Sequence, residues 1–287
     1  MLWTVQADTV QRLGRRLTSA PGLGRVLATR PMSRLGSILL GARLVREPFR
    51  FAARELCGRG TGLYRLRGGD IRVALRHGTV DRATYDEVFH DRLYDPPESV
   101  RRLLASLDRP VVCDLGANVG MFGAWALTEI SPAEIIAFEP DPENAALHEA
   151  VIAANRTSVR WRLERAAAGA SDREASFDAG RYSESRLVTD GSGRSSVQVR
   201  DVFPELERVD VLKIDVEGGE WELLDDPRFT RLPVRVIALE YHPHLCPHPD
   251  PRAAAWRALE RAGFALVQSD TWAGPERHGM LWAWRAG

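Results

Sequence analysis

The chain has 287 residues, which is enough for one large α/β domain with an appended segment or for two modest domains. Lysine plus arginine equals aspartate plus glutamate at 39 each, so the overall charge argues against a nucleic-acid or acidic-membrane partner. The three cysteines form no CxxC pair and no apolar stretch near the N-terminus is long enough to cross a bilayer, so we expect a cytoplasmic protein without a disulfide framework or a transmembrane segment.

Residues 1–60 are predicted to form a helical and basic extension. Arginines recur through it, and proline and glycine interrupt it at Pro21-Gly22, Pro31 and Pro48. Five apolar residues follow helical spacing, namely Leu35, Ile38, Leu39, Ala42 and Val45. We expect this stripe to pack on the rest of the chain, because most such stripes face a core. A membrane surface, a partner helix or a second copy of the chain in a homodimer is the alternative.

Residues 61–109 are predicted to contain a β-hairpin followed by two short helices. Apolar and polar residues alternate over residues 62–76 around the turn Gly68-Gly69-Asp70. One helix is expected to start at Asp81, and Pro96-Pro97 introduces the other. These elements lead into the main domain.

Residues 110–287 alternate apolar strands with helices, which predicts a Rossmann-like α/β domain with helices on both faces of a parallel sheet. The predicted strands are residues 111–115, 134–138, 158–163, 209–214, 234–239, 265–268 and 280–284. The predicted helices are residues 121–128, 142–155, 220–224 and 251–262. Two strand-like runs, 175–178 and 196–200, flank a polar stretch at 189–194 that is expected to be a loop. Five crossover strands and two closely spaced ones suit a seven-stranded sheet whose last strand runs antiparallel.

The turn after the first strand of this domain carries the strongest ligand-binding pattern. Asp114 lies in the strand, and the tight turn that follows contains Gly116 and Gly120 and opens directly into a helix. In a doubly wound sheet, ligands bind at the carboxyl ends of the strands beside the topological switch point, and glycines let the backbone approach the ligand. The turn departs from the dinucleotide pattern G-x-G-x-x-G. Asn118 occupies the position of the second glycine, and Phe122-Gly123 follows in place of the third. An ordinary βα turn is the alternative.

The second strand of the domain ends at an acid. Glu139 lies 19 positions beyond Gly120, and Pro140 then ends the strand. A carboxylate at this place accepts hydrogen bonds from both ribose hydroxyls of an adenosine. The glycine turn and the acid together therefore indicate a nucleoside ligand more specifically than either does alone.

Three stretches of the sequence carry a resemblance to a known family: DLGANVGMF at residues 114–122, Phe138-Glu139-Pro140, and VLKIDVEGGE at residues 211–220. They resemble the motifs of FkbM-type S-adenosylmethionine (SAM)-dependent methyltransferases, and the resemblance covers residues 62–239. It implies a seven-stranded methyltransferase sheet, SAM as the cofactor, and O-methylation of a hydroxyl on a sugar or natural-product small molecule. The cofactor-binding residues of this hypothesis are Asp114, Gly116, Asn118, Gly120, Phe122, Glu139 and Asp215.

The same resemblance gives residues 61–109 a place beside the cofactor site, where they would cap the active site. Four residues of this segment are candidates for acceptor binding or for a lid, namely Arg76, His77, Asp81 and Tyr94. A charged hairpin surface without such a role is the alternative.

Methyl transfer to an alcohol needs a group that removes or polarises the hydroxyl proton, because an alcohol ionises far above neutral pH. Asp215 ends the fourth strand at the carboxyl edge of the sheet, and Glu240 and His242 share one face at the end of the fifth. We expect His242 to act as the general base. Alternatively, Asp215, Glu240 and His242 hold a divalent cation such as Mg²⁺ that polarises the acceptor oxygen. Lys213 is expected to pair with a nearby acid, and Glu220 to interact with the dipole of its helix.

Two other classes of protein compete with a methyltransferase. An NAD-dependent oxidoreductase would need the third glycine and a tyrosine–lysine or histidine pair, and neither stands in place. A non-catalytic Rossmann-like binding module would keep the sheet without needing Asp215 or Glu240. The histidine- and proline-rich run at residues 242–248 lacks the paired spacing of a zinc site and is expected to be a surface loop. The acceptor is expected to be a small molecule rather than a nucleic acid.

Overall fold

The computed structural model describes residues 30–156, 158–178, 186–188, 195–243, 246–268 and 279–285. Its central sheet consists of β3 (Val111–Leu115), β4 (Glu134–Phe138), β5 (Arg160–Glu164), β10 (Val211–Ile214), β11 (Val236–Tyr241), β12 (Ala265–Gln268) and β13 (Gly279–Trp284). The strand order is β12-β13-β11-β10-β3-β4-β5. β13 runs antiparallel to both of its neighbours, and every other neighbouring pair is parallel. The predicted α/β fold, with seven strands and an antiparallel last strand, is therefore confirmed.

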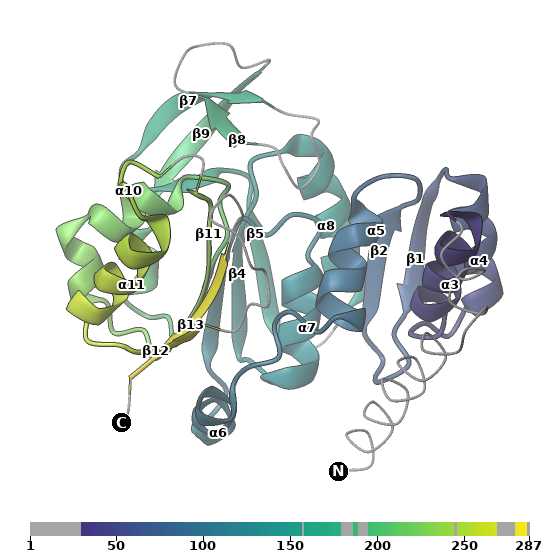
Figure 1. Cartoon of the computed structure of the whole chain (residues 1–287), viewed down its shortest axis with the longest axis horizontal. Helices are drawn as coiled ribbons and strands as arrows, with labels where there is room; N and C mark the ends of the chain where they lie inside the picture. The colour runs from purple at the N-terminus through teal and green to yellow at the C-terminus, as the bar shows by residue number, and fades with distance from the viewer. Residues whose placement is uncertain are drawn as a thin grey trace, which may run out of the picture.

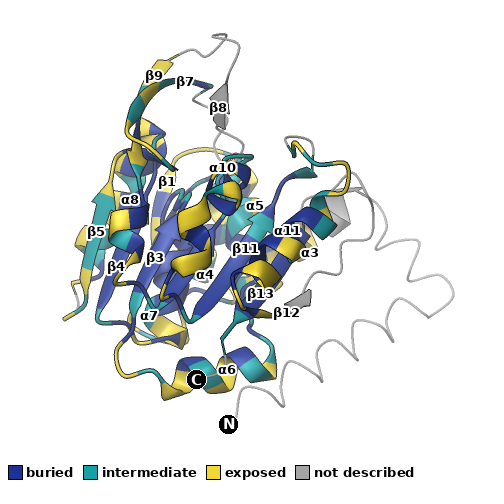
Figure 2. Ribbon diagram, turned by 90° about the vertical axis from the view of Figure 1, so that its left-hand side faces the viewer, coloured by how far each residue is buried: buried dark blue, intermediate teal, exposed yellow. Residues whose placement is uncertain are grey.

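Helices cover both faces of this sheet. On one face lie α10 (Glu220–Asp225) and α11 (Pro251–Arg261), and on the other lie α7 (Met121–Glu129) and α8 (Pro142–Ala154) (Figure 1). Figure 2 shows the central strands as a buried layer between them, which explains why their sequences are apolar runs rather than alternating patterns. The other helices of this part of the chain are α6 (Glu98–Ser106), α9 (Phe203–Leu206) and the 3₁₀ helix η3 (Pro227–Arg231). Within the described residues, no helix combines the length and the apolar character needed to cross a membrane.

The order of the strands fixes where a ligand binds. The chain leaves β3 for β4 on one side and later returns to β10 on the other side of β3. The loops that follow β3 and β10 therefore separate above the sheet, and this topological switch point is the usual ligand crevice of doubly wound folds. Asp114 faces Lys213 across this boundary in the strand register.

The N-terminal segment adds two further layers outside α7 and α8. The hairpin of β1 (Thr61–Arg65) and β2 (Arg72–Arg76) lies against these helices, and α3 (Arg30–Ala42) and α4 (Pro48–Cys57) cover its outer side (Figure 1). The side chain of Asn155, at the end of α8, accepts a hydrogen bond from the backbone N–H of Arg72 and donates one to its carbonyl, both at 2.7 Å. The predicted helix at Asp81 is α5 (Asp81–Tyr85), which continues into the π-helix η1 (Asp86–His90).

A second, four-stranded sheet lies beyond the edge of the central one, where Figure 1 shows β7, β8 and β9 above α10 and α8. It has the order β6-β9-β7-β8 and consists of β6 (Ala167–Gly169), β7 (Arg173–Asp178), β8 (Arg186–Val188) and β9 (Ser195–Asp201). The sequence indicated the runs that form β7 and β9 but not their sheet, because two of its strands have only three residues and show no periodicity. The loop predicted at residues 189–194 lies outside the described residues.

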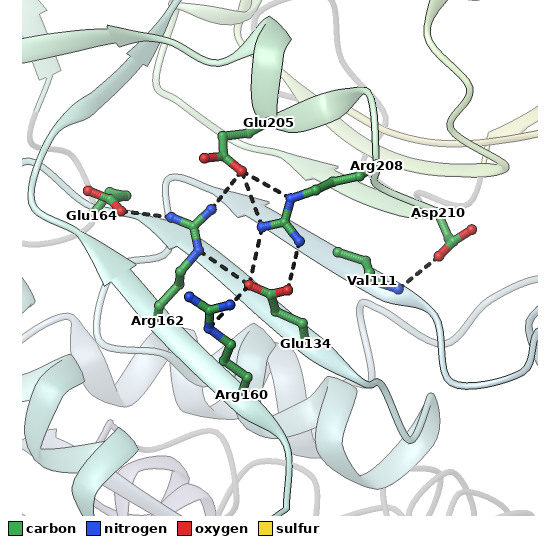
Figure 3. Close-up of polar contacts among 8 residues, drawn as sticks. All are labelled: Val111, Glu134, Arg160, Arg162, Glu164, Glu205, Arg208 and Asp210. Atoms are coloured by element: carbon green, nitrogen blue, oxygen red, sulfur yellow. Dashed lines mark hydrogen bonds and ion pairs between the residues drawn. The ribbon is translucent and has the colours of Figure 1, made fainter.

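An ion-pair network joins the starts of β4 and β5 to the segment before β10 (Figure 3). Glu134 contacts Arg208 at 2.7 Å and Arg162 at 3.4 Å, and Glu205 contacts the same two arginines. The hydrogen bond from Arg208 lowers the pKa of Glu134. In the same region Asp210 accepts a hydrogen bond from the backbone N–H of Val111 at 2.8 Å. This network lies at the amino ends of the strands, opposite the ligand edge, and its role is to fix the chain connection.

Candidate active site

The turn after β3 has three residues with a positive φ, a backbone conformation that glycine adopts freely and asparagine more readily than most other residues. Gly116 and Gly120 have φ of 77° and 85°, and Asn118 has φ of 47°. A Cβ atom on Gly116 would collide with the backbone carbonyl of Asp215 after β10. A Cβ on Gly120 would lie 2.7 Å from the ring of His148, a buried residue of α8. The two glycines thus let the turn pass between the end of β10 and α8.

Glu139, directly after β4, organises this turn from the other side. One carboxylate oxygen accepts the backbone N–H of Asn118 at 2.8 Å, and the other accepts that of Asp141 at 2.9 Å. The side-chain amide of Asn144 lies 3.4 Å from the second oxygen. Burial raises the pKa of Glu139 to about 7, although these hydrogen bonds act in the opposite sense. A buried carboxylate with lone pairs left over is suited to accept further donors from a ligand.

Lys213, the single lysine of the chain, ties the turn to the neighbouring strand. Its buried ammonium lies 3.1 Å from Asp114 on β3 and 3.3 Å from Asp215 after β10, and it donates a hydrogen bond to the carbonyl of Gly116 at 2.7 Å. Burial alone would lower the pKa of Lys213, but the two carboxylates outweigh it and raise the pKa well above its ordinary value. The predicted pairing with an acid is present, and it extends to an acid on β3 that the sequence did not indicate as a partner.

Asp215, Glu240 and His242 meet at the carboxyl ends of β10 and β11. Each offers one ligand-type atom, and these atoms lie within 4.8 Å of one another. The nearest oxygen of Asp215 is 3.9 Å from Nε2 of His242. Burial and the charge of Asp215 raise the pKa of Glu240 well above its ordinary value. The three residues that the sequence placed at strand ends therefore form one cluster.

Glu220 is a residue of this site whose role the sequence did not reveal. Its side chain is fully buried, and one oxygen accepts the backbone N–H of His242 at 2.7 Å while lying 3.2 Å from Nδ1 of the same histidine. The other oxygen accepts the backbone N–H of Gly218 at 2.8 Å. Burial alone would lower the pKa of His242, but Glu220, followed by Glu217 and Asp215, raises it to about 10. Glu220 was expected to interact with the dipole of its helix, and in the structure its carboxylate also contacts the backbone and the ring of His242.

The N-terminal segment contributes to the same site from the opposite side. Tyr94 is buried against Phe122 with ring centroids 4.9 Å apart, and the ammonium of Lys213 lies 6.0 Å from the centroid of Phe122. Glu87 of η1 is partly buried, and burial followed by the charge of Asp215 raises its pKa. A π-helical turn is a frequent feature of functional sites. The stretch Glu87-Val88-Phe89 forms part of the family resemblance, but the sequence assigned Glu87 no role in the site, because its approach to Asp215 depends on how η1 packs.

The other candidates in this segment hold the hairpin in place, and Arg76 reaches Asn144, whose amide lies beside Glu139. Arg76 and Asp81 form a two-pronged ion pair at 2.8 Å, and Arg76 also donates to Asn144 at 2.6 Å. His77 is buried, with its Nδ1 2.6 Å from a carboxylate oxygen of Glu55 and its Nε2 2.7 Å from the hydroxyl of Tyr64. These contacts hold the hairpin to α4, α5 and α8.

The turn is compatible with a ligand that donates hydrogen bonds. The carboxylate of Asp114 and the amide oxygen of Asn118 are buried. One oxygen of Asp114 is paired with the ammonium of Lys213, and within the described residues its other oxygen and the amide oxygen of Asn118 accept no hydrogen bond. Buried oxygens of this kind normally find a donor. Asn118 lies within the glycine turn and next to Glu139, so the residues present fit a cofactor with an adenosine and an amino-acid portion, such as SAM.

The sequence is similar to known methyltransferases. Residues 114–266 match the family described as the Methyltransferase FkbM domain. Methyltransferase sdnD of Sordaria araneosa is 26% identical, with 70% of this chain and 88% of the relative covered. Methyltransferase 1 of Beauveria bassiana (strain ARSEF 2860) is 25% identical, with coverage of 67% and 84%.

Among solved structures, a methyltransferase FkbM from Methylobacillus flagellatus KT aligns with a TM-score of 0.45 and 13% identity over 88% of this chain. This chain spans 59% of that protein's chain. The matched domain covers more than half of the sequence and includes the glycine turn, Glu139 and the Asp215–Glu240–His242 cluster. The chain belongs to the FkbM-type family of SAM-dependent methyltransferases.

Proposed function

We propose that this methyltransferase transfers the methyl group of SAM to a hydroxyl of a sugar or natural-product small molecule. The observation that carries the proposal is the cluster of Asp215, Glu240 and His242 beside the glycine turn. An O-methyltransferase needs proton-handling groups next to its methyl donor. A binding module without chemistry has no need of three such groups at one edge of the sheet.

The cofactor side of the site is assigned to the turn and its neighbours. SAM supplies an activated methyl group, so the protein has chiefly to bind and align. Glu139 would accept the ribose hydroxyls, and the backbone between Gly116 and Gly120, with Asn118, would hold the amino-acid portion. Asp114 acts through Lys213, which fixes the carbonyl of Gly116. Phe122 forms the wall between Lys213 and Tyr94.

The acceptor side is assigned to the three-residue cluster and to residues 61–109. We propose that this segment caps the acceptor site, because Tyr94 and Glu87 approach the cluster from it. Residues 110–287 would then be the SAM-binding domain and residues 1–60 an extension. His242 would take the hydroxyl proton. Because the pKa of His242 is about 10, this requires a nearby positive charge that lowers it, and the sulfonium of the bound cofactor is such a charge.

A divalent cation is the second way to handle the proton, and the donor set fits one. Two carboxylates and an imidazole within 4.8 Å leave coordination positions for a hydroxyl and for water. Asp215, Glu240 and His242 would hold the ion, which would polarise the acceptor oxygen. Activity assays with Mg²⁺ and with EDTA separate the two arrangements: chelation abolishes turnover only in the second.

Calorimetric titration with S-adenosylhomocysteine, with NAD as a control, tests the proposal first. Micromolar binding of S-adenosylhomocysteine alone is the expected result, and binding of NAD alone would point to an oxidoreductase. Hydroxylated sugars and natural products are then screened as acceptors. Asp215→Ala should retain S-adenosylhomocysteine binding and lose turnover. A variant that transfers methyl groups at the normal rate would contradict the assignment of Asp215.

A further inference from the structure

The large hydrophobic side chains that are exposed within the described residues are confined to one part of the molecule. They are Leu35, Leu39 and Leu40 of α3, Phe49 and Leu56 of α4, and Leu63 of β1, which lies apart from the others beside Ala153 and Ala154 of α8. Phe49 is 90% exposed and Leu56 is 61% exposed. Single exposed leucines are ordinary, but a group of them on adjacent elements marks an interaction surface.

The way α4 packs on the hairpin leaves one apolar side of this helix exposed to solvent. Phe49, Ala53 and Leu56 follow the spacing i, i+4, i+7 and are all exposed, so they form one face of the helix. Phe51 and Glu55 lie on the opposite face and are buried against the hairpin. Glu55 is held there by a hydrogen bond of 2.6 Å to the histidine that follows β2. The apolar face therefore cannot turn into the protein without breaking this contact.

α3 has the same division. Ile38 and Ala42 are buried with Val45, as expected for a stripe that packs on its own protein, while Leu35 and Leu39 of that stripe remain about half exposed at 47% and 52%. α3 and α4 are the outermost layer of the molecule, at the end opposite α10 and α11 (Figure 1). We name the exposed side of this layer the α3–α4 face.

The exposed charged residues near the α3–α4 face are mostly positive. Arg43, Arg46 and Arg59 are exposed beside the apolar residues. The acids of this stretch are occupied: Glu47 accepts the backbone N–H of Arg65, and Glu55 is buried. Over residues 1–60 the sequence has 11 arginines and three acids, while the remaining residues have 28 lysines and arginines against 36 acids. The balanced charge of the whole chain thus conceals a cationic N-terminal region.

We propose that the α3–α4 face binds a lipid surface with anionic headgroups. Exposed phenylalanine and leucine beside arginine is the composition of interfacial helices, whose apolar residues enter the acyl boundary while their cations meet lipid phosphates. A nucleic acid would match the arginines but would gain nothing from the apolar residues. This surface lies away from the glycine turn, and the proposal does not depend on the reaction.

Co-sedimentation of the full chain with vesicles tests the proposal. We expect binding to vesicles of phosphatidylcholine with added phosphatidylglycerol, weaker binding to phosphatidylcholine alone, and release by salt. Phe49→Ser with Leu56→Ser should weaken binding roughly tenfold or more, because the apolar area that enters the lipid is lost. Arg43→Glu with Arg59→Glu should also weaken it, whereas Arg101→Glu with Arg102→Glu, on the exposed side of α6, is the matched charge control. Circular dichroism and the thermal midpoint verify that each variant is folded.

The exposed thiol of Cys57, next to Leu56, reports on the same face. An environment-sensitive fluorophore at Cys57, in a Cys246→Ser background, should shift to the blue when anionic vesicles are added. Three outcomes overturn the proposal: unchanged sedimentation of the Phe49–Leu56 variant, a Cys57 thiol that does not react with the fluorophore, or a dimer that the same variant converts to monomers while no vesicle is bound.

Discussion

Glu220 and His242 come from different elements, and a single carboxylate oxygen of Glu220 contacts both the backbone N–H and the ring Nδ1 of His242. Two contacts from one fully buried acid fix the position of the histidine backbone and the rotation of its ring. Nε2 is thereby directed toward Asp215 and Glu217, at 3.9 and 3.4 Å. Glu220 is thus a positioning residue for the candidate proton-handling group.

Glu220→Gln should move the acidic limb of the kcat–pH profile to lower pH, because His242 must lose its own proton before it can act as the general base. The variant retains an acceptor for a backbone N–H but loses the charge that raises the pKa of His242, which should fall from about 10 toward its ordinary value. Histidine NMR signals followed against pH measure this shift. Glu222→Gln on the same helix is the control, because Glu222 pairs with Arg173 at the surface. An unchanged His242 pKa would contradict the argument.

Removal of the Lys213 ammonium should destabilise the protein strongly. Lys213→Met leaves the buried carboxylate of Asp114 without its ion pair, and the loss of one partner of a buried pair costs about 3–5 kcal/mol. The free energy of unfolding in urea measures this loss. Lys213→Met combined with Asp114→Leu should recover a large part of it, since no unpaired charge then remains on β3. A double variant no more stable than the single one would show that Lys213 acts mainly through Gly116.

Gly116→Ala should abolish binding of S-adenosylhomocysteine. The new Cβ would meet the carbonyl of Asp215, and φ of 77° is strained for alanine. Calorimetry gives the affinity, and the thermal midpoint shows how far the turn as a whole is disturbed. Gly68→Ala, in the hairpin turn, is the matched control, because its Cβ would have no atom within 4 Å. Similar effects of the two substitutions would argue against a special role for the turn after β3.

The affinity for S-adenosylhomocysteine should rise with pH between about 6 and 8. Burial raises the pKa of Glu139 to about 7, so the ligand-free protein retains this proton in the acidic part of that range, while ribose hydroxyls bind best to the ionised form. The same shift makes the ligand-free protein less stable as pH rises from 4.5, the ordinary pKa, to about 7. Titration at several pH values measures the affinity, and Glu139→Gln should flatten its pH dependence. A slope that persists in this variant would assign the proton to another group.

Much of the fold and of the site could be predicted from the sequence alone. All seven strands of the central sheet were indicated, with deviations of two residues or fewer at every end. Those buried on both faces, such as β3, β4 and β10, are continuous apolar runs, whereas β5 at the edge is only partly buried. The glycine turn and Glu139 follow from chain spacing within one βαβ unit. Asp215, Glu240 and His242 could be grouped because carboxyl ends of neighbouring parallel strands meet at one edge.

Contacts between elements distant in sequence were decided only by the tertiary structure. Lys213 reaches Asp114 because β10 and β3 are neighbours in a register that no local pattern encodes. Glu220 turns inward because its helix packs against the end of β11, and the short strands β6 and β8 exist only through their partners. The stripe of α3 was visible as helical spacing, but periodicity defines a face without stating what covers it. Packing buried Ile38 and left Leu39 exposed, since only one side of α3 meets the rest of the protein.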